Sequence, residues 1–95
     1  MKKEIFIVNS VHFYDGELDT QIVGIENNWE DAAHLLSLEY NAVRKMRDTY
    51  GADNLTFDDV VDEYDNWHKI TSPDCKEIFQ IEIVGKTIDL DITIL

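Results

Sequence analysis

The sequence predicts a single α+β domain, spanning residues 1–95, in which one long helix packs on one face of an antiparallel sheet of four to five strands. Three observations support this prediction. Two alternating segments precede residue 27 and are joined by a tight turn, a helical pattern covers residues 28–51, and alternation returns between residues 76 and 95. The expected order is two strands, the long helix, a short second helix and three further strands.

The first two predicted strands, residues 3–14 and 18–26, form a hairpin. Between them, Tyr14-Asp15-Gly16-Glu17 contains the Asp-Gly pair typical of a tight turn. Apolar side chains occur in both alternating sets of residues 3–14, which indicates a central strand. Gly24 interrupts the second strand and indicates either a bulge or the close approach of the helix.

Local signals place the long helix over residues 28–51. Asn28 is a suitable N-cap, and Glu30 and Asp31 lie in the first turn, where the helix dipole favours negative charge. Gly51 can adopt the left-handed conformation that closes a helix. An apolar stripe at helical spacing predicts the buried face: Ala32, Ala33, Leu35, Leu36, Tyr40, Val43, Met46 and Tyr50. The opposite face, expected to meet water, carries Glu30, His34, Asn41, Lys45 and Asp48.

Residues 57–64 are predicted to form the short second helix. Thr56 and Asp59 have the spacing of a capping box, and Leu55 and Val60 have that of a hydrophobic staple. A competing interpretation is an irregular strand, because the valines and aromatic residues of this segment also suit strands.

The remainder of the chain is predicted to be extended. Residues 66–72 are followed by Ser72-Pro73-Asp74-Cys75, which suits a type I turn, and by an alternating strand over residues 76–84. Gly85-Lys86 is interpreted as a turn into a last strand over residues 87–95. The inward side chains of that strand are expected to be Ile88, Leu90, Ile92 and Ile94.

The balance of charge limits the classes of partner. The chain has 20 acidic and 8 basic side chains, which gives a net charge of −12. Phosphates repel such a chain, so direct binding to DNA, RNA or an anionic membrane is not expected. A basic protein, above all one with a nucleic-acid-binding groove, is the natural partner.

The sequence indicates a cytoplasmic protein. Cys75 is the only cysteine, so no disulfide can form within the chain, which fits a reducing compartment. The apolar run after Lys2-Lys3 is too short for a signal peptide, and no run reaches the length of a membrane span.

No catalytic signature is recognisable, and we expect a non-enzymatic protein without a cofactor. The four glycines are too scattered for a phosphate-binding loop. The spacing of His12, His34 and His68 does not require a metal site. Cys75 lies beside Asp74, whose negative charge disfavours a thiolate nucleophile, so an ordinary free thiol is expected.

The most distinctive feature is an acidic segment. No Lys or Arg occurs between Arg47 and Lys69, while acids are frequent there. On a helix, Asp58, Asp62 and Asp65 share one face, and such like-charge neighbours cost a few tenths of a kcal/mol per pair. A fixed array of carboxylates can imitate the phosphates of a nucleic acid. The alternative is that the acids serve only solubility.

Two aromatic residues, Tyr64 and Trp67, flank this acidic segment. Aromatic anchors inside a charged rim are typical of protein-binding hot spots, although core packing competes as an explanation. The predicted partner-binding residues are therefore Asp53, Asp58, Asp59, Asp62, Glu63, Tyr64, Asp65 and Trp67.

The strand–Tyr14-Asp15-Gly16-Glu17-Leu18–strand segment, followed by Val23-Gly24 and a helix that opens with Glu30-Asp31-Ala32, resembles a group of small acidic uncharacterised proteins from phages and bacteria. The resemblance covers the first half of the chain and, more weakly, the last strands, and it rests mostly on turn and packing residues. It implies no reaction and no functional residue. By size and charge alone, the chain is similar to phage-encoded inhibitors of bacterial defence, including anti-CRISPR proteins.

The leading hypothesis is a protein-binding inhibitor that uses the acidic segment to occupy a basic nucleic-acid groove. A second hypothesis is a homo-oligomeric structural or accessory domain, with a homodimer formed through the C-terminal strand that ends in Ile94-Leu95. A third is a small metal-dependent enzyme that uses carboxylates and His68.

Overall fold

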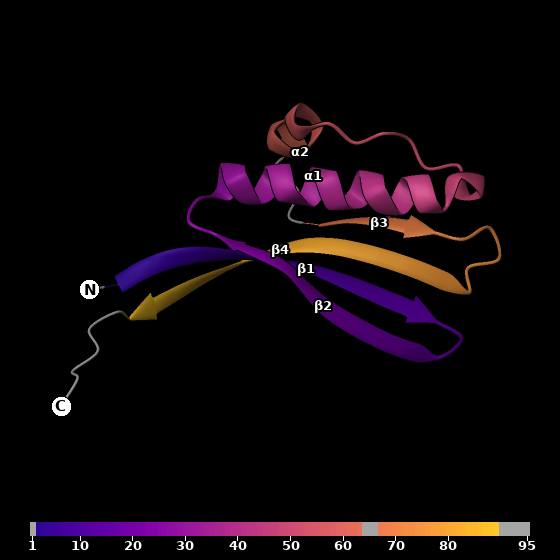
Figure 1. Cartoon of the computed structure of the whole chain (residues 1–95), viewed down its shortest axis with the longest axis horizontal. Helices are drawn as coiled ribbons and strands as arrows, with labels where there is room; N and C mark the ends of the chain where they lie inside the picture. Colours follow the sequence, from indigo (N-terminus) through magenta and orange to yellow (C-terminus); the bar gives the residue numbers. More distant parts are fainter. Residues whose placement is uncertain (1, 64–66, 90–95) are drawn as a thin grey trace.

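A computed structural model describes residues 2–63 and 67–89, and it confirms the α+β prediction. The sheet contains β1 (Lys2–Tyr14), β2 (Glu17–Glu26), β3 (Trp67–Thr71) and β4 (Glu77–Asp89) in the order β2-β1-β4-β3, with every pair antiparallel. The helices α1 (Trp29–Met46) and α2 (Phe57–Glu63) both lie on the same side of this sheet, as Figure 1 shows.

The first hairpin forms as predicted, with β1 inside the sheet. Tyr14 pairs with Glu17, and the two residues between them have positive φ, 50° at Asp15 and 79° at Gly16. Both expectations for Gly24 are confirmed. The β1–β2 register shifts beside it, between Val8 and Asn9, and a Cβ at Gly24 would lie 2.5 Å from Leu35 Cδ2 on α1.

The start of α1 is confirmed, but the prediction of one unbroken helix to Gly51 is wrong. Asn28 Oδ1 accepts a hydrogen bond of 2.9 Å from the Asp31 backbone N–H. The α-helix ends at Met46, because Arg47 has φ −119° and ψ 49°, outside the helical region. A 3-10 turn over Asp48–Tyr50 follows, and Gly51 closes it with φ 71°.

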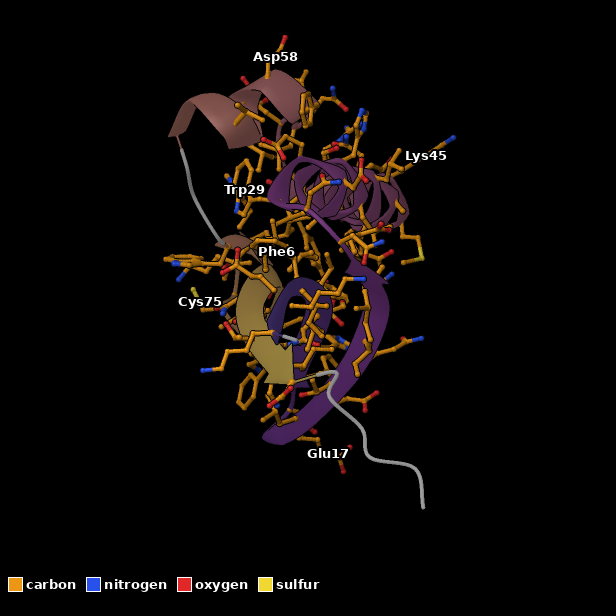
Figure 2. The ribbon with its side chains drawn as sticks, turned by 90° about the vertical axis from the view of Figure 1, so that its left-hand side faces the viewer. Phe6, Glu17, Trp29, Lys45, Asp58 and Cys75 are labelled. Carbon is orange, nitrogen blue, oxygen red and sulfur yellow. The ribbon has the colours of Figure 1, made fainter. Side chains whose placement is uncertain are left out.

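The core lies between α1 and the sheet. Its largest fully buried side chains come from both layers and from α2, namely Val8, Leu36, Val60, Ile70 and Ile81. The predicted apolar stripe of α1 is largely confirmed, although Met46 at its end is 64% exposed. Phe6 is one of the partly buried side chains that pack against this core, and Figure 2 shows it beneath α1.

The structure confirms α2 and its capping box. Thr56 Oγ1 accepts from the Asp59 N–H at 3.1 Å, and the Asp59 carboxylate accepts from the Thr56 N–H at 2.9 Å. The expectation that Asn41 simply faces water is wrong. Its side-chain amide donates to the Leu55 carbonyl at 2.6 Å and accepts from the Leu55 N–H at 2.8 Å. These two bonds fasten the segment that leads into α2 to the outer side of α1.

The turn predicted at Gly85-Lys86 is wrong, because β4 runs through both residues without a break. Gly85 pairs with Phe6 and Lys86 with Ile5, so the long strand β1 provides a partner for every residue of β4. A Cβ at Gly85 would lie 3.7 Å from the Phe6 ring, in ordinary contact. The type I turn at residues 72–75 is supported by a 2.9 Å hydrogen bond from Cys75 N–H to Ser72 O. Ile88, which was predicted to point inward, instead lies on the face turned away from α1, because the unbroken strand continues the alternation of Phe79, Ile81 and Ile83. The other predicted inward residues, Leu90, Ile92 and Ile94, lie outside the described residues.

Candidate functional site

The predicted acidic residues gather on α2 and on the segment before it. Asp53, Asp58 and Asp59 are exposed. In Figure 2, Asp58 lies at the end of the molecule farthest from the sheet. Asp62 and Glu63 belong to α2, but their side chains, like Tyr64 and Asp65 as a whole, lie outside the described residues. The part of the array that the structure describes therefore faces solvent on the outermost helix.

Asp59 is exposed, and it also stabilises the start of α2. Its carboxylate accepts the hydrogen bond from the Thr56 backbone at the start of α2. That bond, together with the Thr56 hydroxyl, lowers the pKa of Asp59 below its ordinary value. Removal of this carboxylate would therefore disturb the helix as well as the surface charge.

Trp67 lies at the start of the edge strand β3. It pairs with Glu82 in the sheet, while its neighbours His68 and Ile70 point toward α1. Because side chains alternate along a strand, Trp67 points to the opposite face of the sheet, where it is 52% exposed. The Trp67 side chain therefore projects from the face of the sheet that is turned away from α1.

The face of the sheet turned away from α1, here called the open face, is strongly apolar. Cross-strand pairs such as Ile7 with Ile25, and Phe13 with Leu18, place their side chains together on it. Its apolar members are Ile5, Ile7, Val11, Phe13, Leu18, Ile22, Ile25, Trp67, Ile78, Val84 and Ile88. No element within residues 2–63 and 67–89 covers this face (Figure 1).

A polar cluster that sequence analysis missed surrounds Glu77 at the start of β4. The Glu77 residue is only 6% exposed. Its Oε1 accepts from Tyr50 OH at 2.5 Å and from Arg47 Nε at 3.0 Å, and its Oε2 lies 2.9 Å from His12 Nε2. Glu77 therefore joins the end of α1 and the 3-10 turn to strands β1 and β4.

The electrostatics of this cluster favour a permanent carboxylate. Burial raises the pKa of Glu77, but the hydrogen bonds from Tyr50, Arg47 and His12 outweigh burial and lower the pKa to about 2. A group ionised in this way is a poor proton donor at neutral pH. The His12 ring also stacks on Phe79 with 4.2 Å between centroids, and the Arg47 guanidinium lies 5.4 Å from the same ring. The cluster is thus suited to fixing the fold.

One signal in the sequence could have revealed Glu77. It occupies the same alternating set as Phe79, Ile81 and Ile83, so the pattern that predicts their burial also places a carboxylate inside. An inward acid requires partners, because an unpaired buried charge is costly.

A cleft of about 360 Å³ lies beside the cluster, lined by Tyr14, Asp15, Tyr50, Ser72, Asp74, Lys76 and Glu77.

The three histidines lie at separate places. His12 contacts Glu77, His34 stacks on Phe57 at 4.5 Å, and His68 packs its ring against the edge of Tyr40 at 6.0 Å. Within the part of the chain that the structure describes, no three His, Cys, Asp or Glu side chains converge as a metal site would require. Cys75 is exposed, in a left-handed backbone conformation with φ 61°.

No protein-family model, curated protein or solved structure matches the chain. Of the helices that the structure describes, none is both long enough and apolar enough to cross a membrane.

Proposed function

We propose that the protein is a non-enzymatic protein-binding inhibitor. Its acidic surface, formed by α2 and the segment before it, occupies the basic groove of a nucleic-acid-handling protein. The proposal includes the anti-defence role of phage proteins that are similar in size and charge, and action in the cytoplasm. The open face of the sheet is not required for this function.

The observation that carries the proposal is the position of α2 as the outermost layer of the molecule. Figure 1 shows α1 between α2 and the sheet. The capping box, the His34–Phe57 stacking and the two Asn41–Leu55 hydrogen bonds hold α2 there. The acids of α2 are thus presented on a supported helix, which reduces the entropy lost on binding.

Charge makes a nucleic-acid-binding groove the fitting partner. The net charge is −12, and the chain has no Lys or Arg from Asp48 to His68. Duplex DNA presents one negative charge per ~1.7 Å along its axis, and a groove built for it carries many cations. A carboxylate array can occupy such a groove, with an affinity that falls as salt screens the charges.

The homodimer predicted to form through the C-terminal strand involves residues beyond Asp89. Those residues lie outside the described part of the chain, so that hypothesis remains a prediction.

Binding can be tested with a triple variant, Asp58→Asn, Asp62→Asn and Glu63→Gln, which leaves the cap residue Asp59 unchanged. The matched control is Asp15→Asn, Glu17→Gln and Asp19→Asn, which removes the same charge at the first hairpin. Wild type and both variants are used to capture proteins from nuclease-treated bacterial lysate at low and moderate salt. Any protein that is captured is then purified, and duplex DNA is tested as a competitor for its binding to the wild-type chain.

The proposal expects a nucleic-acid-binding protein that wild type and the hairpin control retain, that the α2 variant loses, and that DNA displaces. If the α2 variant and the hairpin control capture the same proteins equally, the acidity serves solubility and the proposal fails. Capture that DNA does not displace would also contradict it, because the groove would then not be the binding site.

A further inference from the structure

The open face of the sheet is unusually apolar for a surface in contact with water. Among the side chains that project from it, Leu18 is 68% exposed, Ile22 58% and Ile25 56%. On this face Ile25 pairs with Ile7 and Leu18 with Phe13, while Ile22 pairs with Asn9. Antiparallel sheets with one face in water normally carry polar residues on that face. A largely apolar strip along two strands, in which Asn9 and Thr20 are the polar members, instead indicates a surface that another molecule covers.

The size of the open face suits an interface. The four strands have 13, 10, 5 and 13 residues. Each strand residue covers about 16 Å² of the sheet plane, so the face extends over roughly 650 Å². A standard interface buries ~800 Å² on each partner, so a flat sheet of this size is close to sufficient. Sheets that pack face to face lie ~10 Å apart, with their side chains interdigitated.

The distribution of acids allows a second copy of the chain to approach the open face. Of the acids on the described strands, the residue pairing places only Glu82 on this face, together with Lys3, Lys69 and Lys86. A dimer through this face keeps the acidic α2 surfaces of the two copies on opposite outer sides, where their mutual repulsion is smallest.

The two ends of the open face are complementary in charge. Lys3 and Lys86 lie toward the start of β1, whereas Asp15 lies in the hairpin turn beyond its other end. A two-fold axis that crosses the strands in the plane of the interface would place the lysine end of one copy over the acidic end of the other. This isologous arrangement repeats each favourable pair twice.

We propose that the protein forms a homodimer in which the open faces of two copies pack against each other with their strands antiparallel. The dimer then has the two sheets inside, followed on each side by α1 and, outermost, by α2. The apolar strip of β1 and β2 forms the centre of the interface, and the charged ends form its rim.

The dimer is tested by sedimentation equilibrium of the whole chain up to millimolar concentration. The variants are Ile22→Glu and, separately, Leu18→Glu. Because both side chains are more than half exposed, the substitutions leave the core intact. The matched control is Leu38→Glu, since Leu38 on α1 is 63% exposed but lies away from the open face. Circular dichroism checks that every variant is folded.

We expect a wild-type dimer that the control retains and that both open-face variants weaken, with Kd raised at least ~30-fold. Carbodiimide cross-linking of mixed labelled and unlabelled chains should join Lys3 or Lys86 of one copy to Asp15 of the other. Within one chain these ends are roughly 35 Å apart, too far for such a link. A wild-type monomer, or a dimer that both variants leave unchanged, would overturn the proposal. Either result leaves the acidic-surface proposal untouched, because no target protein is present.

Discussion

Substitution of Glu77 by Gln tests the main polar contact between the helical layer and the sheet. The change removes the charge and keeps the shape of the side chain. The carboxylate of Glu77 has contacts with Tyr50, Arg47 and His12, and its two oxygens share them. An amide has one acceptor oxygen and a donating nitrogen, so it cannot accept from all three. In the variant, Arg47 lies beside a neutral amide, and that amide occupies a nearly buried position.

The expected loss of stability follows from the pKa of Glu77. Its lowering from 4.5 to about 2 corresponds to roughly 3 kcal/mol of preference for the charged form, at ~1.4 kcal/mol per pKa unit. The side chain is only 8% exposed, so solvent screening reduces this value little. Since the amide keeps one of the hydrogen bonds, we expect the free energy of unfolding to fall by about 2–3 kcal/mol at neutral pH.

The pKa of Glu77 also predicts how the stability of the protein changes with pH. The pKa of Glu77 is lower in the folded state than in the unfolded chain, so the unfolded state binds the proton more readily. The stabilisation is complete above pH ~4.5 and is lost as the pH falls from there to about 2. The Glu77→Gln variant lacks this contribution, so its stability should fall less steeply over the same interval.

Urea denaturation followed by tryptophan fluorescence measures both effects. The control is Glu17→Gln, which makes the same change of charge at an exposed position of the hairpin. The control should lie within ~0.5 kcal/mol of wild type. A Glu77→Gln variant as stable as the control, or one with the wild-type slope between pH 4.5 and 2, would refute the role assigned to this carboxylate.

Three further substitutions test the packing around α1. Gly24→Ala should lower the free energy of unfolding by about 1–2 kcal/mol, because the new methyl group meets Leu35. The loss should be smaller when Leu35 is also replaced by Ala, and an equal loss in both backgrounds would contradict the contact. Asn41→Ala should cost about 2 kcal/mol through loss of both hydrogen bonds to Leu55, measured by urea denaturation, whereas a neutral result would mean that α2 docks without them. Thr56→Ala should cost about 1 kcal/mol through loss of the N-cap, and Thr56→Ser should restore most of it.

Elements with strong local signals were predictable from the sequence. The Asp15-Gly16 turn, the Asn28 cap and the Thr56–Asp59 capping box each depend on neighbours in the chain, and all three occur in the structure. The acidic segment was also visible, because charge is a property of the sequence itself. Its value as a binding surface remains a prediction.

Features that depend on tertiary partners were not predictable in the same way. Gly85 is a residue typical of turns, yet it remains within β4 because the long strand β1 extends far enough to pair with it. Trp67 follows the acids in sequence, but strand alternation turns it to the opposite face of the sheet. The role of Glu77 depends on Arg47 and His12, which lie 30 and 65 residues away.

The two proposed surfaces lie on opposite sides of the molecule, and this arrangement has a consequence for binding. A dimer through the open faces would hold its two α2 helices on outer layers, on the order of 50 Å apart for layers spaced at 8–10 Å. One groove could then not receive both helices, and each dimer would bind two target sites. Linked sites of this kind raise apparent affinity by a factor on the order of 10²–10⁴ when both can be reached. The Ile22→Glu variant should therefore bind a target in solution with unchanged affinity per chain, yet dissociate faster from a surface densely coated with that target. Equal dissociation of wild type and variant from the dense surface would show that the two acidic surfaces act independently.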